Sequence, residues 1–95
     1  MRYEIVFAPE AIEDLKRLSA RNRAIVRDEI EKHLRFEPDK PSQSRIKRLR
    51  GLSRPQYRLR VGDIRVFYDI EGEAVEVLAI VEKTEAGAWL EEKGE

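Results

Sequence analysis

Two short glycine turns in the C-terminal half restrict how this chain can fold more than any other feature of its sequence. Gly62-Asp63 lies between the runs 56–61 and 64–70, and Glu71–Glu73 lies between 64–70 and 74–81. All three runs are rich in β-branched and aromatic residues, which favour strands. A two-residue loop that begins with glycine suits a type II′ turn, which joins antiparallel strands. The sequence therefore predicts a three-stranded antiparallel meander.

The N-terminal half predicts one strand followed by two helices. Arg2–Phe7 alternates apolar and polar residues as a strand does, and Pro9 suits the first position of a helix. The first helix is expected to present an apolar stripe of Ile12, Leu15 and Leu18. The second helix, at about 23–36, is expected to present Val26, Ile30 and Leu34. Because only a short break separates the two helices, they should form an antiparallel hairpin.

The remaining segments complete an α+β fold. Two prolines in Pro38–Pro41 end the helical region, a further strand is expected at 46–50, and a short helix at 85–92 carries Trp89 and Leu90. We therefore expect one domain, residues 1–95, with the N-terminal strand and the helical hairpin packed on one face of a mostly antiparallel sheet. The opposite face of the sheet would then be free to present polar groups to a partner.

Composition excludes several classes of function. The 95 residues include no cysteine, which excludes a disulfide framework and a thiolate metal site, and a single histidine, His33. We therefore expect no metal and no cofactor. No apolar run approaches the length needed to span a bilayer, and the N-terminus lacks the core of a signal peptide, so we expect a cytoplasmic protein without membrane contact.

Charge is sorted along the chain although the net charge is zero. The segment from Lys40 to Arg65 holds nine basic residues and one acid, a net charge of +8. The segment from Asp69 to Glu95 holds nine acids and two lysines, a net charge of −7. Such asymmetry indicates a surface that binds a polyanion. The alternative is that the basic and acidic halves pair with each other.

Strand alternation places three arginines of the basic segment on one face of the sheet. Arg58 and Arg60 alternate with apolar residues, and the glycine turn pairs Arg60 with Arg65 across the hairpin. Like charges so placed repel unless an anion lies among them, and guanidinium groups suit a phosphate. The alternative is pairing with Glu82, Glu85 or the acidic C-terminal segment. Because Arg65 points away from the hairpin, we expect Arg65→Ala to leave the domain folded.

These segments resemble one known superfamily. The runs 48–52 (RLRGL), 57–61 (YRLRV), 62–68 (GDIRVFY) and 77–81 (VLAIV) are similar to those of the RelE/ParE toxins of bacterial type II toxin–antitoxin modules. The resemblance covers essentially the whole chain and implies the fold expected from the patterning. In the RelE branch it implies a ribosome-dependent endoribonuclease that cuts messenger RNA without a metal. It also implies two partners, a cognate antitoxin and the ribosome with its message.

The resemblance carries over a catalytic set of basic residues: Arg58, Arg60, Arg65 and Lys83. We expect RNA binding by five further residues: Lys47, Arg48, Arg50, Arg54 and Trp89. Arginine stays protonated at pH 7 and is a poor base, so Lys83 is the matched group that could carry a proton. Glu82 and Glu85 are alternative carriers. Trp89 could stack on a base or could attach the last helix to the sheet.

Two other functions remain open at this point. A ParE-like chain would inhibit DNA gyrase by binding it, without RNA chemistry. A non-enzymatic module would bind RNA or the ribosome through the same basic surface. The three converging arginines favour the nuclease, because ParE-type chains generally lack a clustered basic set.

Overall fold

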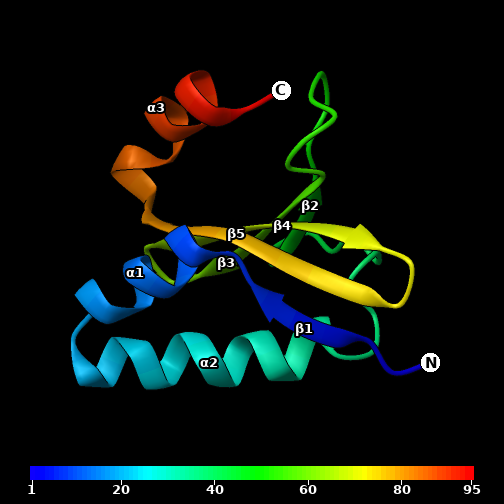
Figure 1. The fold of residues 1–95 in the computed structure, drawn as a ribbon, viewed down its shortest axis with the longest axis horizontal. Coiled ribbons are helices and arrows are strands. Elements are labelled where there is room, and N and C mark those ends of the chain that lie inside the picture. The colour runs from blue at the N-terminus through cyan, green and yellow to red at the C-terminus, as the bar shows by residue number, and fades with distance from the viewer.

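A computed structural model describes the whole chain, residues 1–95. One sheet of five strands, in the order β1-β5-β4-β3-β2, carries helices on both of its faces (Figure 1). The elements in chain order are β1 (Glu4–Phe7), α1 (Pro9–Arg17), α2 (Ala20–Leu34), β2 (Ile46–Arg48), β3 (Tyr57–Val61), β4 (Ile64–Glu71), β5 (Ala74–Glu82) and α3 (Lys83–Lys93). The expected α+β class and the order of elements are confirmed.

The antiparallel meander of β3, β4 and β5 is confirmed as well. Val61 pairs with Ile64 across the first turn, where Gly62 has a φ of 57° and thus occupies the left-handed region that a type II′ turn requires at its first position. Gly72, with a φ of 59°, begins the second turn. β2 pairs antiparallel with β3, whereas β1 pairs parallel with β5, so the sheet is mixed.

The helical hairpin covers one face of the sheet and encloses the main core. Val26, Ile30 and Leu34 of α2 are buried, as their spacing predicts. The stripe expected on α1 is wrong in part: Leu15 is buried, but Ile12 is 43% exposed and Ala11 takes its place in the core. The small side chain of an alanine lets α1 lie close to the sheet.

Two buried polar side chains fix the hairpin and the following loop to the sheet. Asp14 Oδ2 of α1 accepts a hydrogen bond of 2.9 Å from the backbone N–H of Ile80 in β5. The Tyr68 hydroxyl donates a hydrogen bond of 2.6 Å to the Pro38 carbonyl in the α2–β2 connection. Burial raises the pKa of Tyr68, with a further contribution from Tyr57, so the hydroxyl remains a donor. Both buried groups are therefore satisfied, as buried polar atoms must be.

The second face of the sheet is not open along its whole width, because α3 lies over part of it (Figure 1). Trp89 stacks on Phe67 of β4, with 4.9 Å between the ring centroids and 6° between the planes. Both ends of the helix are also tied down. The backbone N–H of Lys83 donates to the Asp63 carbonyl at 2.7 Å, and that of Ser53 donates to the Glu95 carbonyl at 2.7 Å. The expectation that only one face would be covered is therefore wrong.

Element boundaries differ from the expected ones by a few residues. β1 begins at Glu4, not at Arg2, because the backbone N–H of Tyr3 donates to the Arg35 carbonyl beyond α2. α2 begins at Ala20, after Ser19, whose Oγ accepts a hydrogen bond from the Asn22 N–H. None of the three helices has the length and apolar character needed to cross a bilayer.

Candidate functional site

The register of the sheet brings the three arginines together on the face opposite the helical hairpin. Arg60 of β3 lies directly across from Arg65 of β4, as the turn predicts. Arg58 lies two residues before Arg60 on the same face, and its partner on β2 is Lys47. We call these four residues, with Lys83 at the start of α3, the cationic face. Cross-strand partners share a face, so the expected convergence of Arg58, Arg60 and Arg65 is confirmed.

No carboxylate neutralises the cationic face. Eight ion pairs occur in the structure, and none of them includes Arg58, Arg60, Arg65, Lys47 or Lys83. The hydrogen bonds of these side chains likewise include no carboxylate. The alternative interpretation, that the arginines pair with the acidic C-terminal segment, is therefore wrong.

Glu82, one of the two acids expected as alternative proton carriers, lies on the wrong face of the sheet. It pairs with Ile64, whose side chain lies in the main core on the hairpin side. There it lines a hollow with Leu18 and Ile25, on the opposite side of the sheet from the arginines. Glu82 is thus wrong as a proton carrier for the cationic face, whereas Glu85 lies exposed in the first turn of α3.

Arg58 has the most unfavourable electrostatic environment of the set. It is half-buried, and its Nε is enclosed without a hydrogen-bond partner. Burial lowers the pKa of the Arg58 guanidinium, and the positive charges of Arg65 and Arg60 lower it further. A lowered pKa in a cation means that the folded protein disfavours the charge. An anion on this face would relieve the repulsion between the guanidinium groups.

Arg65 has a second role that the strand pattern did not reveal. Its residue exposure is only 7%. Nη1 donates two hydrogen bonds, to the carbonyls of Gly62 at 2.9 Å and Ile64 at 3.1 Å, and so holds the β3–β4 turn. Arg65→Ala would remove both bonds from the turn, so we still expect the variant to fold, but with reduced stability. The same bonds fix the guanidinium in place beside Arg60, which is exposed.

Lys83 is placed by the backbone rather than by its side chain. Its N–H hydrogen bond to the Asp63 carbonyl fixes the first residue of α3 against the β3–β4 turn. Lys83 follows two residues after Val81, the cross-strand partner of Arg65. Lys83 is exposed and forms no ion pair, and its backbone lies beside the β3–β4 turn, at one end of the cationic face. Its expected role in proton transfer stays a prediction.

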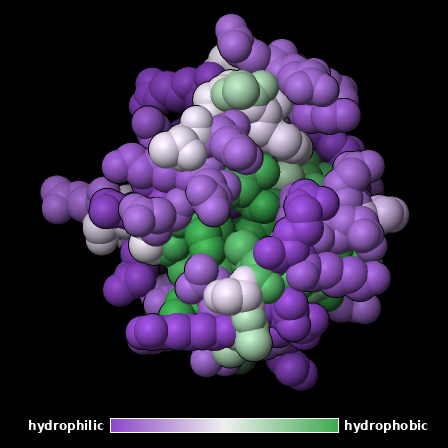
Figure 2. Space-filling model, turned by 90° about the vertical axis from the view of Figure 1, so that its left-hand side faces the viewer, coloured by the Kyte–Doolittle hydropathy of each residue, from purple (hydrophilic) through white to green (hydrophobic).

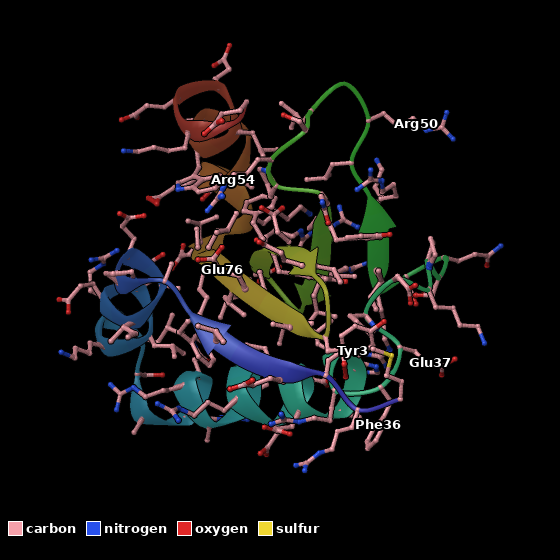
Figure 3. The ribbon with its side chains drawn as sticks, turned by 45° about the vertical axis from the view of Figure 1, so that its right-hand side comes forward. Tyr3, Phe36, Glu37, Arg50, Arg54 and Glu76 are labelled. Atoms are coloured by element: carbon pink, nitrogen blue, oxygen red, sulfur yellow. The ribbon has the colours of Figure 1, made fainter.

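Two residues expected to bind RNA lie elsewhere. Arg48 lies over the ring of Tyr57, at 5.1 Å from its centroid, on the hairpin side of the sheet. Arg54 forms ion pairs with Asp69 and with Glu76, and the side chains of Arg54 and Glu76 lie near each other in Figure 3. Both guanidinium groups therefore have partners of their own. Arg48 is the last residue of β2, and alternation with Lys47 places it on the opposite face. The position of Arg54 could not be predicted from the sequence, because it lies in the loop between β2 and β3.

Arg50 and Trp89 complete the expected set. Arg50 projects into solvent near the tip of the β2–β3 loop (Figure 3). The stack of Trp89 on Phe67 confirms that Trp89 attaches α3 to the sheet. Phe67 is the cross-strand partner of Arg58, so this aromatic pair borders the cationic face. Strand alternation places Phe67 on this face beside Arg65, but the sequence did not reveal its contact with Trp89. Stacking of Trp89 on a base stays a prediction.

The structure contains no cluster of three or more histidine, cysteine, aspartate or glutamate side chains that could hold a metal ion. What the site offers is a group of positive charges on a sheet, of which Arg65 is held in place by hydrogen bonds to the turn. Its chemistry is the binding and electrostatic stabilisation of phosphate groups.

Comparison with known proteins agrees with the fold and the motifs. The family model for the ParE toxin of the type II toxin–antitoxin system parDE matches residues 5–86. The chain therefore belongs to the ParE toxin family and is a toxin of a type II toxin–antitoxin module, within the RelE/ParE superfamily. A comparison with curated proteins gives no significant match.

Solved structures of RelE toxins have the same fold. The toxin–antitoxin complex RelBE2 from Mycobacterium tuberculosis contains a chain with 27% identity and a TM-score of 0.69, with 86% of this chain and 99% of that chain covered. The archaeal RelE–RelB complex from Pyrococcus horikoshii gives 22% identity, 87% and 97% coverage and a TM-score of 0.65. A mutant of the E. coli toxin RelE in the free state gives 18% identity, 94% and 92% coverage and a TM-score of 0.69.

Proposed function

We propose that this toxin is an endoribonuclease that cuts messenger RNA on the ribosome and so inhibits translation. The observation that supports this function is a cationic face on which Arg58, Arg60 and Arg65 converge without any carboxylate partner. Such a face destabilises the free protein and suits a polyanion. The substrate would supply the phosphate that the fold lacks.

The reaction requires neither a metal nor a cofactor. RNA carries its own nucleophile, the 2′-hydroxyl, which attacks the adjacent phosphorus and transfers its proton to a base. The bond from phosphorus to the 5′-oxygen breaks, and that oxygen takes up a proton as it leaves. The products are a 2′,3′-cyclic phosphate and a 5′-hydroxyl. The protein therefore has to align the attack, stabilise the anionic phosphorane and move two protons.

The residues of the cationic face divide these tasks between them. Arg58 and Arg60 stabilise the charge of the phosphorane, and Arg65 fixes the phosphate from its rigid position at the turn. Lys83, at the exposed edge, carries a proton, with Glu85 as the alternative carrier. Lys47 and Arg50 bind flanking phosphates. Trp89 supports the face through Phe67 and offers its free edge to the substrate.

A cognate antitoxin is the second partner in this proposal. The RelE structures from M. tuberculosis and P. horikoshii are toxin–antitoxin complexes. In this chain, apolar side chains are exposed in the middle of one side of the molecule and are surrounded by hydrophilic residues (Figure 2). A hollow of about 610 Å³ is lined by three apolar and three basic side chains: Phe7, Ile12, Leu15, Lys16, Arg23 and Arg27. Exposed apolar surface of this kind is typical of protein interfaces, and it lies apart from the cationic face.

Gyrase inhibition is a second candidate, because the family model that matches the chain is that of ParE toxins. A gyrase inhibitor would need no uncompensated arginines at the centre of its sheet. The cationic face therefore favours the nuclease.

Two parallel assays decide between the candidates. The first incubates the purified chain with ribosomes programmed with a defined message and maps cleavage by primer extension. The second measures supercoiling by purified gyrase. We expect cleavage of the message and normal supercoiling. Arg60→Ala is the matched inactive variant, because Arg60 is exposed and its loss leaves the fold intact.

The opposite result would overturn the proposal. Inhibited supercoiling with an intact message would assign the chain to the gyrase class. Binding to ribosomes without cleavage and without gyrase inhibition would leave a non-enzymatic binding module. Cleavage by Arg58→Ala and Arg60→Ala at the wild-type rate would show that the active site lies elsewhere.

A further inference from the structure

A second positively charged site lies outside the cationic face, at the C-terminal end of α2. A hollow of about 300 Å³ opens there between the helix and the connection to β2. Four of its lining side chains are basic, and they come from two separate segments: Lys32 and His33 on α2, and Lys40 and Arg45 on the connection. Nothing in the proposed reaction uses them. The volume is at the lower end of the range for ligand sites, about 300–1,000 Å³.

An exposed aromatic ring stands at the rim of this hollow. Phe36 is 59% exposed and projects away from the body of the molecule beside Glu37 (Figure 3). It contributes nothing to the main core, and the residues before and after it are polar. A flat apolar ring next to a group of cations is the combination that binds single-stranded nucleic acid, in which bases stack and phosphates pair with basic groups.

Two acids, Glu37 and Glu29, offset part of the positive charge around the hollow. Glu37 is paired with Lys40 at 3.3 Å, but both side chains are largely exposed, so the pair is weak and exchangeable. Lys32 has no ion pair. Glu29, one turn before His33 on α2, does not line the hollow, but its Oε2 lies 2.8 Å from His33 Nε2 and 3.8 Å from Arg45 Nη1. Neither Glu29 Oε2 nor His33 Nε2 completes a hydrogen bond, although both atoms are buried.

We propose that this hollow binds one nucleotide of the RNA strand outside the scissile step, with the base on Phe36 and the phosphate between Lys32 and Lys40. The inference deepens the proposed function. Ile46, the first residue of β2, lines the hollow, and Lys47 follows it on the cationic face beside Arg58. One RNA strand that passes around the β2 edge would therefore contact both sites. RNA is favoured over an acidic protein segment because an acidic peptide has no use for the exposed ring.

The single histidine of the chain provides a direct readout. Because His33 is the only histidine and lines the hollow, its ring protons give two assignable NMR signals without any labelling scheme. The full-length chain is titrated at fixed pH with adenosine monophosphate, with a uridine trinucleotide and with inorganic phosphate. We expect saturable shifts of the His33 signals by both nucleotides, at concentrations about tenfold lower than inorganic phosphate requires.

Matched variants separate stacking from charge. Phe36→Ala should weaken trinucleotide binding by on the order of tenfold, the effect of removing one stacking platform. Ile25→Ala, another exposed apolar residue of the same hairpin, should leave it unchanged. Lys32→Glu should weaken binding at least as much as Phe36→Ala does. Arg21→Glu, an exposed charge reversal in the first turn of the same helix, should have no effect.

The result is independent of catalysis. Arg60→Ala should lower the cleavage rate by on the order of 10²–10³ but leave the His33 shifts intact, so failure of the nuclease proposal and failure of this one are distinguishable. Equal affinity for inorganic phosphate and for nucleotides, or His33 signals that do not move, would overturn the nucleotide site. Tighter binding of an acidic hexapeptide than of the trinucleotide would instead assign the hollow to a protein partner.

Discussion

The two faces of the sheet are built from the same strands but differ in the side chains that they bury and expose. On β3, Leu59 is completely buried against the helical hairpin, whereas Arg60, the next residue, is exposed on the opposite face. The hairpin face is covered by apolar side chains that pack against one another. The cationic face keeps like charges together without any acid to balance them. One face therefore stabilises the fold, and the other is maintained at a cost in stability that only a ligand can offset.

The largest expected effect is on the hairpin face. Leu59→Ala should lower the free energy of unfolding by about 2–5 kcal/mol, because it removes a buried side chain and leaves a cavity. Urea denaturation followed by circular dichroism measures it. Arg60→Ala, one residue away, should stay within about 0.5 kcal/mol of wild type. Similar losses in the two variants would contradict the division between the faces.

The next effect is on the cationic face and concerns rate. Arg58→Ala and Arg60→Ala should each lower cleavage of a programmed message by on the order of 10²–10³, as expected for one lost charge-stabilising donor. Arg60→Lys should keep substantial activity, because the positive charge survives. Single-turnover cleavage at saturating ribosome concentration measures the chemical step. Equal rates for Arg60→Ala and Arg60→Lys would show that positive charge at this position is not what matters.

The same comparison explains how much the sequence could reveal. Period-two alternation and one glycine turn were enough to place Arg58, Arg60 and Arg65 on a shared face, because the register of a two-residue hairpin is fixed locally. Ala11 could not be recognised as a core residue in preference to Ile12, because a small side chain adds little to the apolar pattern of a helix. Local patterns thus predict which face of a strand a side chain occupies better than they predict which helix residues pack closest to the sheet.

Contacts between distant segments could not be predicted. The sequence of α3 does not indicate which surface the helix covers, because Trp89 and Leu90 are its only large apolar residues. The aromatic partner of Trp89, Phe67, lies 22 positions earlier in the chain. The ion pairs of Arg54 depend on the path of a loop. The burial of Arg65 depends on carbonyls of the turn, which a side-chain pattern does not describe.

Arg65 belongs to the cationic face and also stabilises the fold through its hydrogen bonds to the turn. Arg65→Ala should lower the free energy of unfolding by about 1–3 kcal/mol, because two hydrogen bonds from a charged, buried donor are lost at the turn. Thermal denaturation with a matched Arg60→Ala control measures the difference. Loss of cleavage in Arg65→Ala without loss of stability would show that its hydrogen bonds to the turn contribute little.

The aromatic stack under α3 should have a smaller effect. A double-mutant cycle on Phe67→Leu and Trp89→Leu should give a coupling energy of about 0.5–1.5 kcal/mol, the range for an aromatic pair beyond its buried area. The cycle is measured by urea denaturation. Additive effects of the two substitutions would show that α3 is held chiefly by its backbone ties at Lys83 and Glu95.

The smallest effect has the opposite sign. Burial and the charges of Arg65 and Arg60 lower the pKa of Arg58, so the folded state disfavours this cation. Arg58→Met keeps the length of the side chain and removes the charge, and it should raise the free energy of unfolding by up to about 1 kcal/mol. The same variant should lose cleavage. Sulfate should raise the melting temperature of wild type more than that of Arg58→Met, because an anion relieves the repulsion only where it exists. A destabilised Arg58→Met would mean that this guanidinium supports the fold, and the cost assigned to the cationic face would then have to come from Arg60 and Arg65 alone.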